Sequence, residues 1–181
     1  AWEANRRFIA DGRFGNHLMK LMVSQNVPFT LMYDAWKAGS RALLPLDEEV
    51  ARKQCEAISA KVLSNRKPPY SLKGGLFDAL TATGGDMFAV ENGEVKEAVQ
   101  LFAETEGIDI EPAAGVAVAS LRQALEEGKV EREAVVMLNV TGGGIGRLKA
   151  EHPVVYRKPD YVFRIGAGAE EVKGVIKELF G

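Results

Sequence analysis

Apolar residues follow two patterns along this chain: short continuous runs, and stretches spaced as on one face of a helix. The run at residues 134–140 (AVVMLNV) is apolar almost throughout, which is typical of a strand buried on both faces. Similar shorter runs predict strands at residues 20–24, 86–90, 108–111 and 161–165. Helical spacing predicts helices at residues 1–11, 29–36, 47–63, 76–81, 95–106, 113–127 and 170–179. Alternating strands and helices predict an α/β fold, with a mostly parallel sheet and helices on both faces.

Composition and charge narrow the class of protein. The 181 residues are 46% hydrophobic, which is enough for a substantial core and excludes a disordered chain. With 23 basic and 25 acidic residues, bulk charge does not favour a nucleic-acid or membrane partner. The longest apolar stretch, residues 113–119, is too short to span a membrane. We therefore expect a cytoplasmic protein with no nucleic-acid and no membrane partner.

The start of the chain lacks the usual signals of a helix N-terminus. No Ser, Thr or Asp precedes the apolar spacing that begins at Trp2, and the first residue is not methionine. Two interpretations remain open on this observation: the chain is an excerpt of a longer protein, or its initiator methionine was removed and its first turn is frayed.

The best candidate for a binding site follows the most apolar predicted strand, because ligands of open α/β sheets bind beyond the carboxyl ends of strands. Residues 139–144 (NVTGGG) place the Thr141 hydroxyl beside glycine backbone that a flat ligand could approach closely. Thr141, Gly142 and Gly143 are therefore candidate cofactor-binding residues. A plain flexible turn is the alternative.

Other kinds of site fit the sequence less well. A dinucleotide fingerprint fails after Gly142 because Arg147 stands where its third glycine should be, and the phosphate-binding P-loop is absent. His17, Cys55 and His152 lack the spacing of metal ligands, so we expect no metal. The single cysteine, Cys55, excludes an internal disulfide and is predicted to be a core or interface residue.

Several segments resemble a known enzyme group. Residues 82–86 (ATGGD), 103–107 (AETEG), 110–114 (IEPAA) and 140–142 (VTG) resemble the C-terminal half of threonine synthases, which are pyridoxal-phosphate enzymes of fold type II, the tryptophan-synthase-β family. Within that group, the opening stretch looks more like the cysteate synthases. The segments that carry this similarity are AWEAN (residues 1–5), MVSQN (22–26) and YDAWKAGSR (33–41). Together they cover essentially the whole chain.

The resemblance implies a cofactor, a reaction and a role for Thr141. The cofactor would be pyridoxal 5'-phosphate, and the substrates O-phospho-L-serine and sulfite, converted to L-cysteate on the way to coenzyme M. In such enzymes a Thr-Gly matching Thr141-Gly142 contacts the pyridine nitrogen. Cysteine synthases instead use a serine, where residues 113–114 of this chain are alanines. A hydroxyl leaves that nitrogen largely neutral, which suits β-replacement. A homo-oligomer is also implied.

The resemblance also implies that an N-terminal half is missing. In these enzymes the phosphate-binding loop and the Schiff-base lysine precede the helix that matches residues 1–11, so we expect no catalytic residue in this chain. Residues 1–181 would then be mainly part of the large cofactor-binding domain, inactive alone. Residues 70–74 (YSLKG) resemble the Ser-x-Lys signature of that lysine. Their position is wrong for it, so Lys73 is not expected to serve. The alternatives are a threonine synthase acting on O-phosphohomoserine and a non-catalytic α/β binding module.

Overall fold

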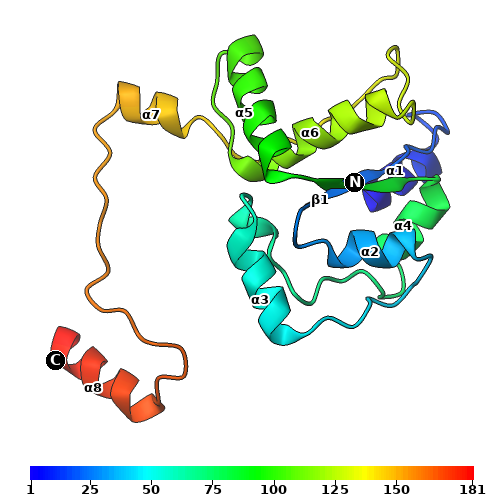
Figure 1. Ribbon diagram of the computed structural model, residues 1–181. Helices are drawn as coiled ribbons and strands as arrows, with labels where there is room; N and C mark the ends of the chain where they lie inside the picture. The colour runs from blue at the N-terminus through cyan, green and yellow to red at the C-terminus, as the bar shows by residue number, and fades with distance from the viewer. The chain divides into compact units, whose positions relative to one another are not determined.

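The computed structural model describes all 181 residues and divides them into two compact units, residues 1–147 and 148–181 (Figure 1). The first unit contains two strands and most of the helices. Its elements are α1 (Trp2–Asp11), β1 (Met22–Asn26), α2 (Leu31–Lys37), α3 (Glu48–Ala57), the 3₁₀ turn η1 (Lys61–Leu63), α4 (Leu76–Thr83), β2 (Asp86–Val90), α5 (Asn92–Glu106) and α6 (Pro112–Glu126). Helix α7 (Ile145–Glu151) crosses the boundary between the units, and α8 (Ala169–Phe180) belongs to the second.

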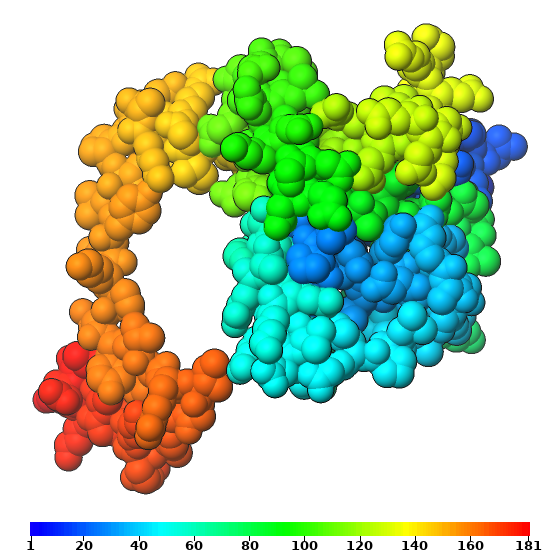
Figure 2. Space-filling view, viewed as in Figure 1, coloured from blue at the N-terminus to red at the C-terminus, as the bar shows by residue number.

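The two strands form a parallel sheet with helices on both of its faces. Met22 of β1 lies opposite Asp86 of β2, and Asn26 lies opposite Val90. Helices α5 and α6 cover one face, and α2, α3 and α4 lie on the other side (Figure 1). In the space-filling view, the green to yellow-green residues of α5 and α6 correspondingly lie on the side opposite the blue to cyan residues of α2 and α3 (Figure 2). This arrangement confirms the predicted α/β class.

Each face of the sheet has its own apolar cluster. Between the sheet and the α5–α6 pair, Val90, Val95 and Val116 are almost fully buried. On the opposite face, Tyr70 and Leu80 are completely buried beside β2. A third cluster lies under α3, where Cys55 is half-buried and packs against it. Cys55 is therefore a packing residue in this structure, as predicted.

Helices α5 and α6 approach each other closely because α6 presents small residues. An added Cβ at Gly115 would lie 2.7 Å from Val99 Cγ2 and 3.2 Å from the Val95 carbonyl oxygen. Gln123 of α6 reaches the sheet, where its Nε2 donates to the Ala89 carbonyl oxygen at 3.1 Å. The glycine in this helix therefore has a packing cause.

All seven predicted helices are present, whereas three of the five predicted strands are not. Residues 20–24 and 86–90 correspond to β1 and β2. Residues 134–140 and 161–165 form no strand, and within residues 108–111 only Ile110 makes a bridge, to Gly143. A strand is defined by hydrogen bonds to a neighbour. In this chain no neighbouring strand pairs with residues 134–140, and Val135 and Met137 are exposed.

One helix boundary and one whole helix differ from the prediction. Helix α3 ends at Ala57 rather than near residue 63, because Ile58 adopts extended backbone with φ −67° and ψ 148°. Helix α7 was not predicted at all. None of the helices combines the length and the apolar composition that crossing a membrane would require.

The second unit is built around α8, which begins after Gly168. Its first turn is acidic, and Glu170 pairs with Lys173 at 2.8 Å. Glu171 is 3.6 Å from Arg164 in the preceding segment, which ties the helix to the loop before it.

Candidate functional site

The carboxyl end of β1 carries two buried amide side chains. Gln25 is 5% exposed, and its Oε1 accepts hydrogen bonds from the backbone N–H groups of Met32 at 2.8 Å and Tyr33 at 2.9 Å. These are N–H groups of the first turn of α2, which helix geometry leaves without partners. Gln25 therefore caps α2 from the sheet. The sequence signal was a polar pair closing an apolar run, and sequence reasoning missed it.

The glycine loop, defined here as residues 141–146, runs antiparallel beside residues 109–111. The Glu111 N–H donates to the Gly142 carbonyl oxygen at 2.9 Å, and the Gly144 N–H donates to the Asp109 carbonyl oxygen at 2.7 Å. Between these two bonds lies the isolated bridge of Ile110 with Gly143. The loop is thus attached to the segment that leads into α6.

This attachment explains why residues 143 and 144 are glycines, and the sequence alone did not suggest this explanation. A Cβ on Gly143 would collide with the Asp109 carbonyl oxygen and lie 3.0 Å from the Ile110 Cα. Gly144 adopts φ +76°, in the left-handed region that favours glycine. These two positions therefore need glycine to bring the loop against residues 109–111, whether or not a ligand also approaches them.

The side chain of Asp109 makes a second connection to the same loop. Its Oδ2 accepts from the Gly146 N–H at 2.9 Å, and its Oδ1 accepts from the Arg147 N–H at 3.4 Å. The hydrogen bond from Gly146 is the main reason why the pKa of Asp109 lies below its usual value; partial burial opposes the shift, and the Arg147 bond assists it. Asp109 and α7 were both missed, because 36 residues separate Asp109 from Ile145 and no local pattern links them.

Thr141 stands at the start of this loop with its side chain exposed. Its hydroxyl has no hydrogen-bond partner within the chain. The chain's other four threonines each use their hydroxyl internally: Thr30 bonds to Asp34, Thr81 to Phe77, Thr83 to Ala79 and Thr105 to Leu101. Thr141 is therefore the threonine whose hydroxyl is free to meet a ligand. This fits a contact with the pyridine nitrogen of pyridoxal phosphate.

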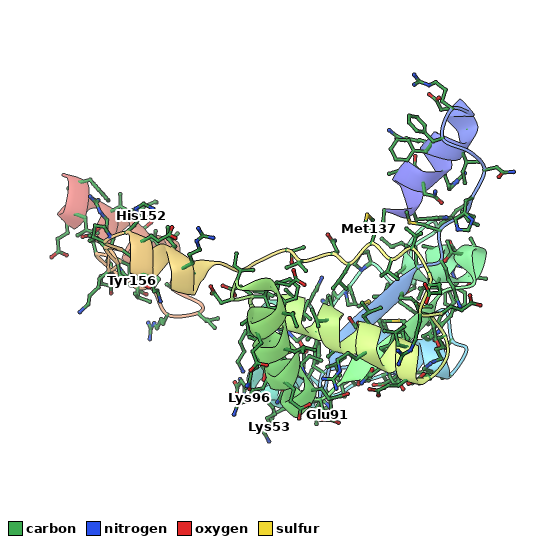
Figure 3. The ribbon with its side chains drawn as sticks, turned by 90° about the horizontal axis from the view of Figure 1, so that it is seen from above. Lys53, Glu91, Lys96, Met137, His152 and Tyr156 are labelled. Atoms are coloured by element: carbon green, nitrogen blue, oxygen red, sulfur yellow. The ribbon has the colours of Figure 1, made fainter.

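The segment before the loop is equally open. Residues 134–140 form neither helix nor strand; Leu138 packs against the apolar cluster of α5 and α6, whereas Met137 projects from the ribbon (Figure 3). Val135 is fully exposed and Met137 is 75% exposed. A run of apolar residues that pairs with no other strand is typical of a sheet strand whose neighbouring strands are missing.

Lys73 lies elsewhere, exposed in the turn that leads into α4. No hydrogen bond or ion pair joins it to the glycine loop. The turn is held instead by Asp78, whose Oδ2 accepts from the Gly74 N–H at 2.7 Å. Arg41 donates to both oxygens of the same carboxylate, at 2.6 and 2.9 Å. Asp78 thereby holds residues 71–74 as an exposed turn, whereas Tyr70, the first residue of the YSLKG segment, is buried.

The sequence of this chain is similar to those of known enzymes. Residues 7–142 match the family model described as pyridoxal-phosphate dependent enzyme, and this range includes Thr141 and Gly142. A cysteate synthase of Methanocella paludicola is 52% identical over 160 residues, covering 88% of this chain and 37% of the relative. One of Methanosarcina mazei is 50% identical over 161 residues, covering 88% and 39%. One of Methanosphaerula palustris is 44% identical over 178 residues, covering 96% and 41%.

The chain thus spans about two fifths of the length of the curated relatives it matches. The family match extends over most of residues 1–147, the unit that holds the parallel sheet and the glycine loop. The resemblance predicted from the sequence is confirmed at the level of both the family and the similarity to cysteate synthases. The chain belongs to the pyridoxal-phosphate dependent enzyme family.

Proposed function

We propose that this chain is the C-terminal portion of an enzyme that converts O-phospho-L-serine and sulfite into L-cysteate and phosphate. The observation that carries the proposal is about 50% identity, over 88% of this chain, with relatives named cysteate synthase. In this reaction the bond from the substrate's Cβ to the phosphate oxygen breaks and phosphate leaves. Sulfite then supplies the electron pair for the new bond from its sulfur to Cβ.

Thr141 would hold the cofactor in this enzyme, with Gly142 and Gly143 lining the same edge. Pyridoxal phosphate, when bound, supplies the electron sink that lets the substrate lose its Cα proton and its Cβ substituent. The Thr141 hydroxyl would donate to the pyridine nitrogen without transferring its proton to it. A neutral ring is a weaker electron sink than a protonated one, and this favours replacement at Cβ over deeper carbanion chemistry. The free hydroxyl of Thr141 supports this role.

The rest of the cofactor site, including the lysine that binds the cofactor, would come from the portion of the enzyme that precedes residue 1. Residues 1–181 would then be mainly part of the large cofactor-binding domain. Support comes from the unpaired apolar segment 134–140, which has the composition of a central strand, and from the greater length of the relatives. A homo-oligomeric state and a cytoplasmic location are part of the same proposal; light scattering and fractionation of the full-length enzyme would test them.

The direct test is an assay of the full-length enzyme loaded with pyridoxal phosphate. We expect sulfite-dependent formation of L-cysteate from O-phospho-L-serine, with phosphate released in equal amount. Formation of threonine from O-phosphohomoserine, without cysteate, would instead establish a threonine synthase. A protein that binds the cofactor but releases phosphate from neither substrate would support a non-catalytic module and refute the proposal.

A further inference from the structure

Asp109 is hydrogen-bonded to the glycine loop through both its backbone and its side chain. Its carbonyl oxygen accepts from the Gly144 N–H at 2.7 Å, while its carboxylate accepts from the Gly146 N–H at 2.9 Å and from the Arg147 N–H at 3.4 Å. Three backbone N–H groups of the loop and of the start of α7 therefore donate to one residue.

Apart from Asp109, the loop is attached by the hydrogen bond from the Glu111 N–H to the Gly142 carbonyl oxygen and by the bridge between Ile110 and Gly143. Four of the five residues 142–146 are glycines, which lose more conformational entropy on ordering than other residues. The residues that begin α7 offer no Ser, Thr, Asp or Asn to cap its N–H groups, so the cap comes from Asp109, across a gap of 36 residues in the chain. Thr141 is the first residue of this loop, and its exposed hydroxyl makes no hydrogen bond within the chain that would hold it in place.

We infer that Asp109 is a positioning residue that fixes the glycine loop so that the Thr141 hydroxyl meets the cofactor ring. The inference rests on the proposed placement of pyridoxal phosphate against Thr141. Asp109 does not touch the cofactor: it acts through Gly144, Gly146 and Arg147, whose backbone it holds. A mobile loop would present the Thr141 hydroxyl in many orientations. The entropy lost when the loop becomes ordered would then weaken cofactor binding.

A purely structural cap makes a different prediction. If Asp109 only stabilises α7, its removal lowers thermal stability and increases exchange of the α7 amides, but leaves the affinity for pyridoxal phosphate unchanged. If Asp109 positions Thr141, its removal also weakens cofactor binding, and it does so only while the Thr141 hydroxyl is present.

The experiment uses the full-length enzyme with Asp109→Ala, Asp109→Asn and the control Glu106→Gln, which removes an exposed carboxylate from the same turn. Apoenzyme is titrated with pyridoxal phosphate, and the absorption spectrum of each complex is recorded. We expect Asp109→Ala to raise the apparent Kd about tenfold, because cofactor binding must then order the loop that Asp109 holds in the wild type. Asp109→Asn keeps one acceptor oxygen for the Gly146 N–H, so its effect should be smaller. Glu106→Gln should match the wild type.

The same variants are then combined with Thr141→Val. Residues that act through a shared contact are non-additive, so Asp109→Ala should change the Kd less than about twofold in the Thr141→Val background. Amide hydrogen exchange of residues 142–147 in the apoenzyme should be faster in Asp109→Ala than in Glu106→Gln. This measurement tests whether Asp109 holds the loop when the cofactor is absent.

Three results would overturn the inference: an unchanged Kd in Asp109→Ala, a tenfold effect that persists unchanged in the Thr141→Val background, or unaltered exchange of the loop. If Asp109→Ala fails to fold, Asp109→Asn supplies the same readouts on a milder scale. A wild-type enzyme that binds pyridoxal phosphate but forms no cysteate would refute the proposed reaction alone, since the Asp109 test measures cofactor affinity rather than turnover.

Discussion

Asn26, the last residue of β1, and Asn92, the first residue of α5, are hydrogen-bonded through their side chains, with Asn26 Nδ2 donating to Asn92 Oδ1 at 3.1 Å. The Asn26 Nδ2 also donates to the Val90 carbonyl oxygen at 2.9 Å, and its Oδ1 accepts from the Ala60 N–H at 3.0 Å. Asn92 accepts from the Ser59 N–H at 2.8 Å. This amide pair therefore joins both strand ends to the turn that follows α3.

Replacing Asn26 with alanine should destabilise the enzyme strongly. Asn26 is 1% exposed, so the change leaves the buried Ala60 N–H without a partner and without water, whereas the Val90 carbonyl oxygen keeps the hydrogen bond from the Val27 N–H at 2.8 Å. An unsatisfied buried donor costs about 1–3 kcal/mol, and we expect a loss of about that size in the free energy of unfolding. Urea unfolding of the full-length enzyme measures it. The control, Asn16→Ala, removes an exposed amide and should change stability by less than about 0.5 kcal/mol.

The Arg41–Asp78 pair should make part of the stability acid-labile. The Arg41 guanidinium, bonded to both carboxylate oxygens, is the main reason why the pKa of Asp78 falls from 3.8 to about 2. A carboxyl whose pKa is lower in the folded state stabilises the fold above its unfolded pKa, and this contribution is lost as the pH falls from about 4 to about 2. Wild type should therefore be more stable than Asp78→Asn near neutral pH, with the difference vanishing across that window.

Thermal unfolding measured from about pH 6 down to about pH 2 tests this dependence. Asp160→Asn, which removes an exposed carboxylate outside the 70–78 turn, serves as the control and should show no such convergence. A constant difference between wild type and Asp78→Asn at all pH values would show that the ion pair does not contribute to the acid sensitivity.

Local patterns predicted the helices and the two paired strands, because apolar spacing and caps are short-range properties. The strand β2 and the helix α6, with Pro112 in its first turn, lie within a residue or two of their expected bounds. The segment 134–140 shows the limit of such reasoning. Its composition is that of a buried strand, but pairing depends on a neighbour, and no part of this chain provides one.

A candidate for the site could be named from the sequence only where one residue carries the signal. Thr141 is a hydroxyl after an apolar run, and the sequence was enough to single it out. Asp109 and Gln25 act on N–H groups that lie 37 and 7 residues away in the chain, so only the three-dimensional structure reveals them. The glycines were assigned to ligand access, whereas the structure gives Gly143 and Gly144 a packing and conformational reason of their own.

The segment 134–140 should become protected in the full-length enzyme. We expect its amides to exchange slowly there, because we propose that it is a strand of the main sheet, and to exchange rapidly in the isolated 181-residue chain, where its backbone has no strand partner. Hydrogen exchange followed by mass spectrometry compares the two. Peptides from α5 provide the reference, since this helix packs on α6 within the chain. Equal rates for the segment in both proteins would contradict the proposal.

Alanine substitutions along the glycine loop should separate packing from ligand access. A Cβ at Gly143 meets the backbone of Asp109 and Ile110, which cannot yield without breaking the bridge, so Gly143→Ala should cost about 1–3 kcal/mol. A Cβ at Gly142 lies 3.0 Å from the Glu111 Cγ, and this flexible side chain can move away. Gly142→Ala should therefore leave stability nearly unchanged. If it weakens pyridoxal phosphate binding in the full-length enzyme all the same, Gly142 lies against the cofactor.

Three substitutions of Thr141 in the full-length enzyme test the proposed contact with the pyridine nitrogen. Thr141→Ser keeps the donor and should retain most activity. Thr141→Val keeps the shape but leaves a polar ring atom unpaired, at a cost of about 1–3 kcal/mol, or roughly 5- to 150-fold in cofactor affinity or rate. Thr141→Asp should favour a protonated ring, shift the cofactor's absorption and impair β-replacement even where binding persists.

The exposure of Thr141 makes these results interpretable, because none of the three changes at an exposed side chain without an internal hydrogen bond should disturb the fold. Each variant is measured by its cofactor spectrum, its apparent Kd for pyridoxal phosphate and its turnover of O-phospho-L-serine with sulfite. The order expected is wild type, Ser, Val for affinity, with Asp set apart by its spectrum. If the valine variant behaves as wild type in all three measurements, Thr141 is a turn residue and the ring nitrogen is held by another part of the enzyme.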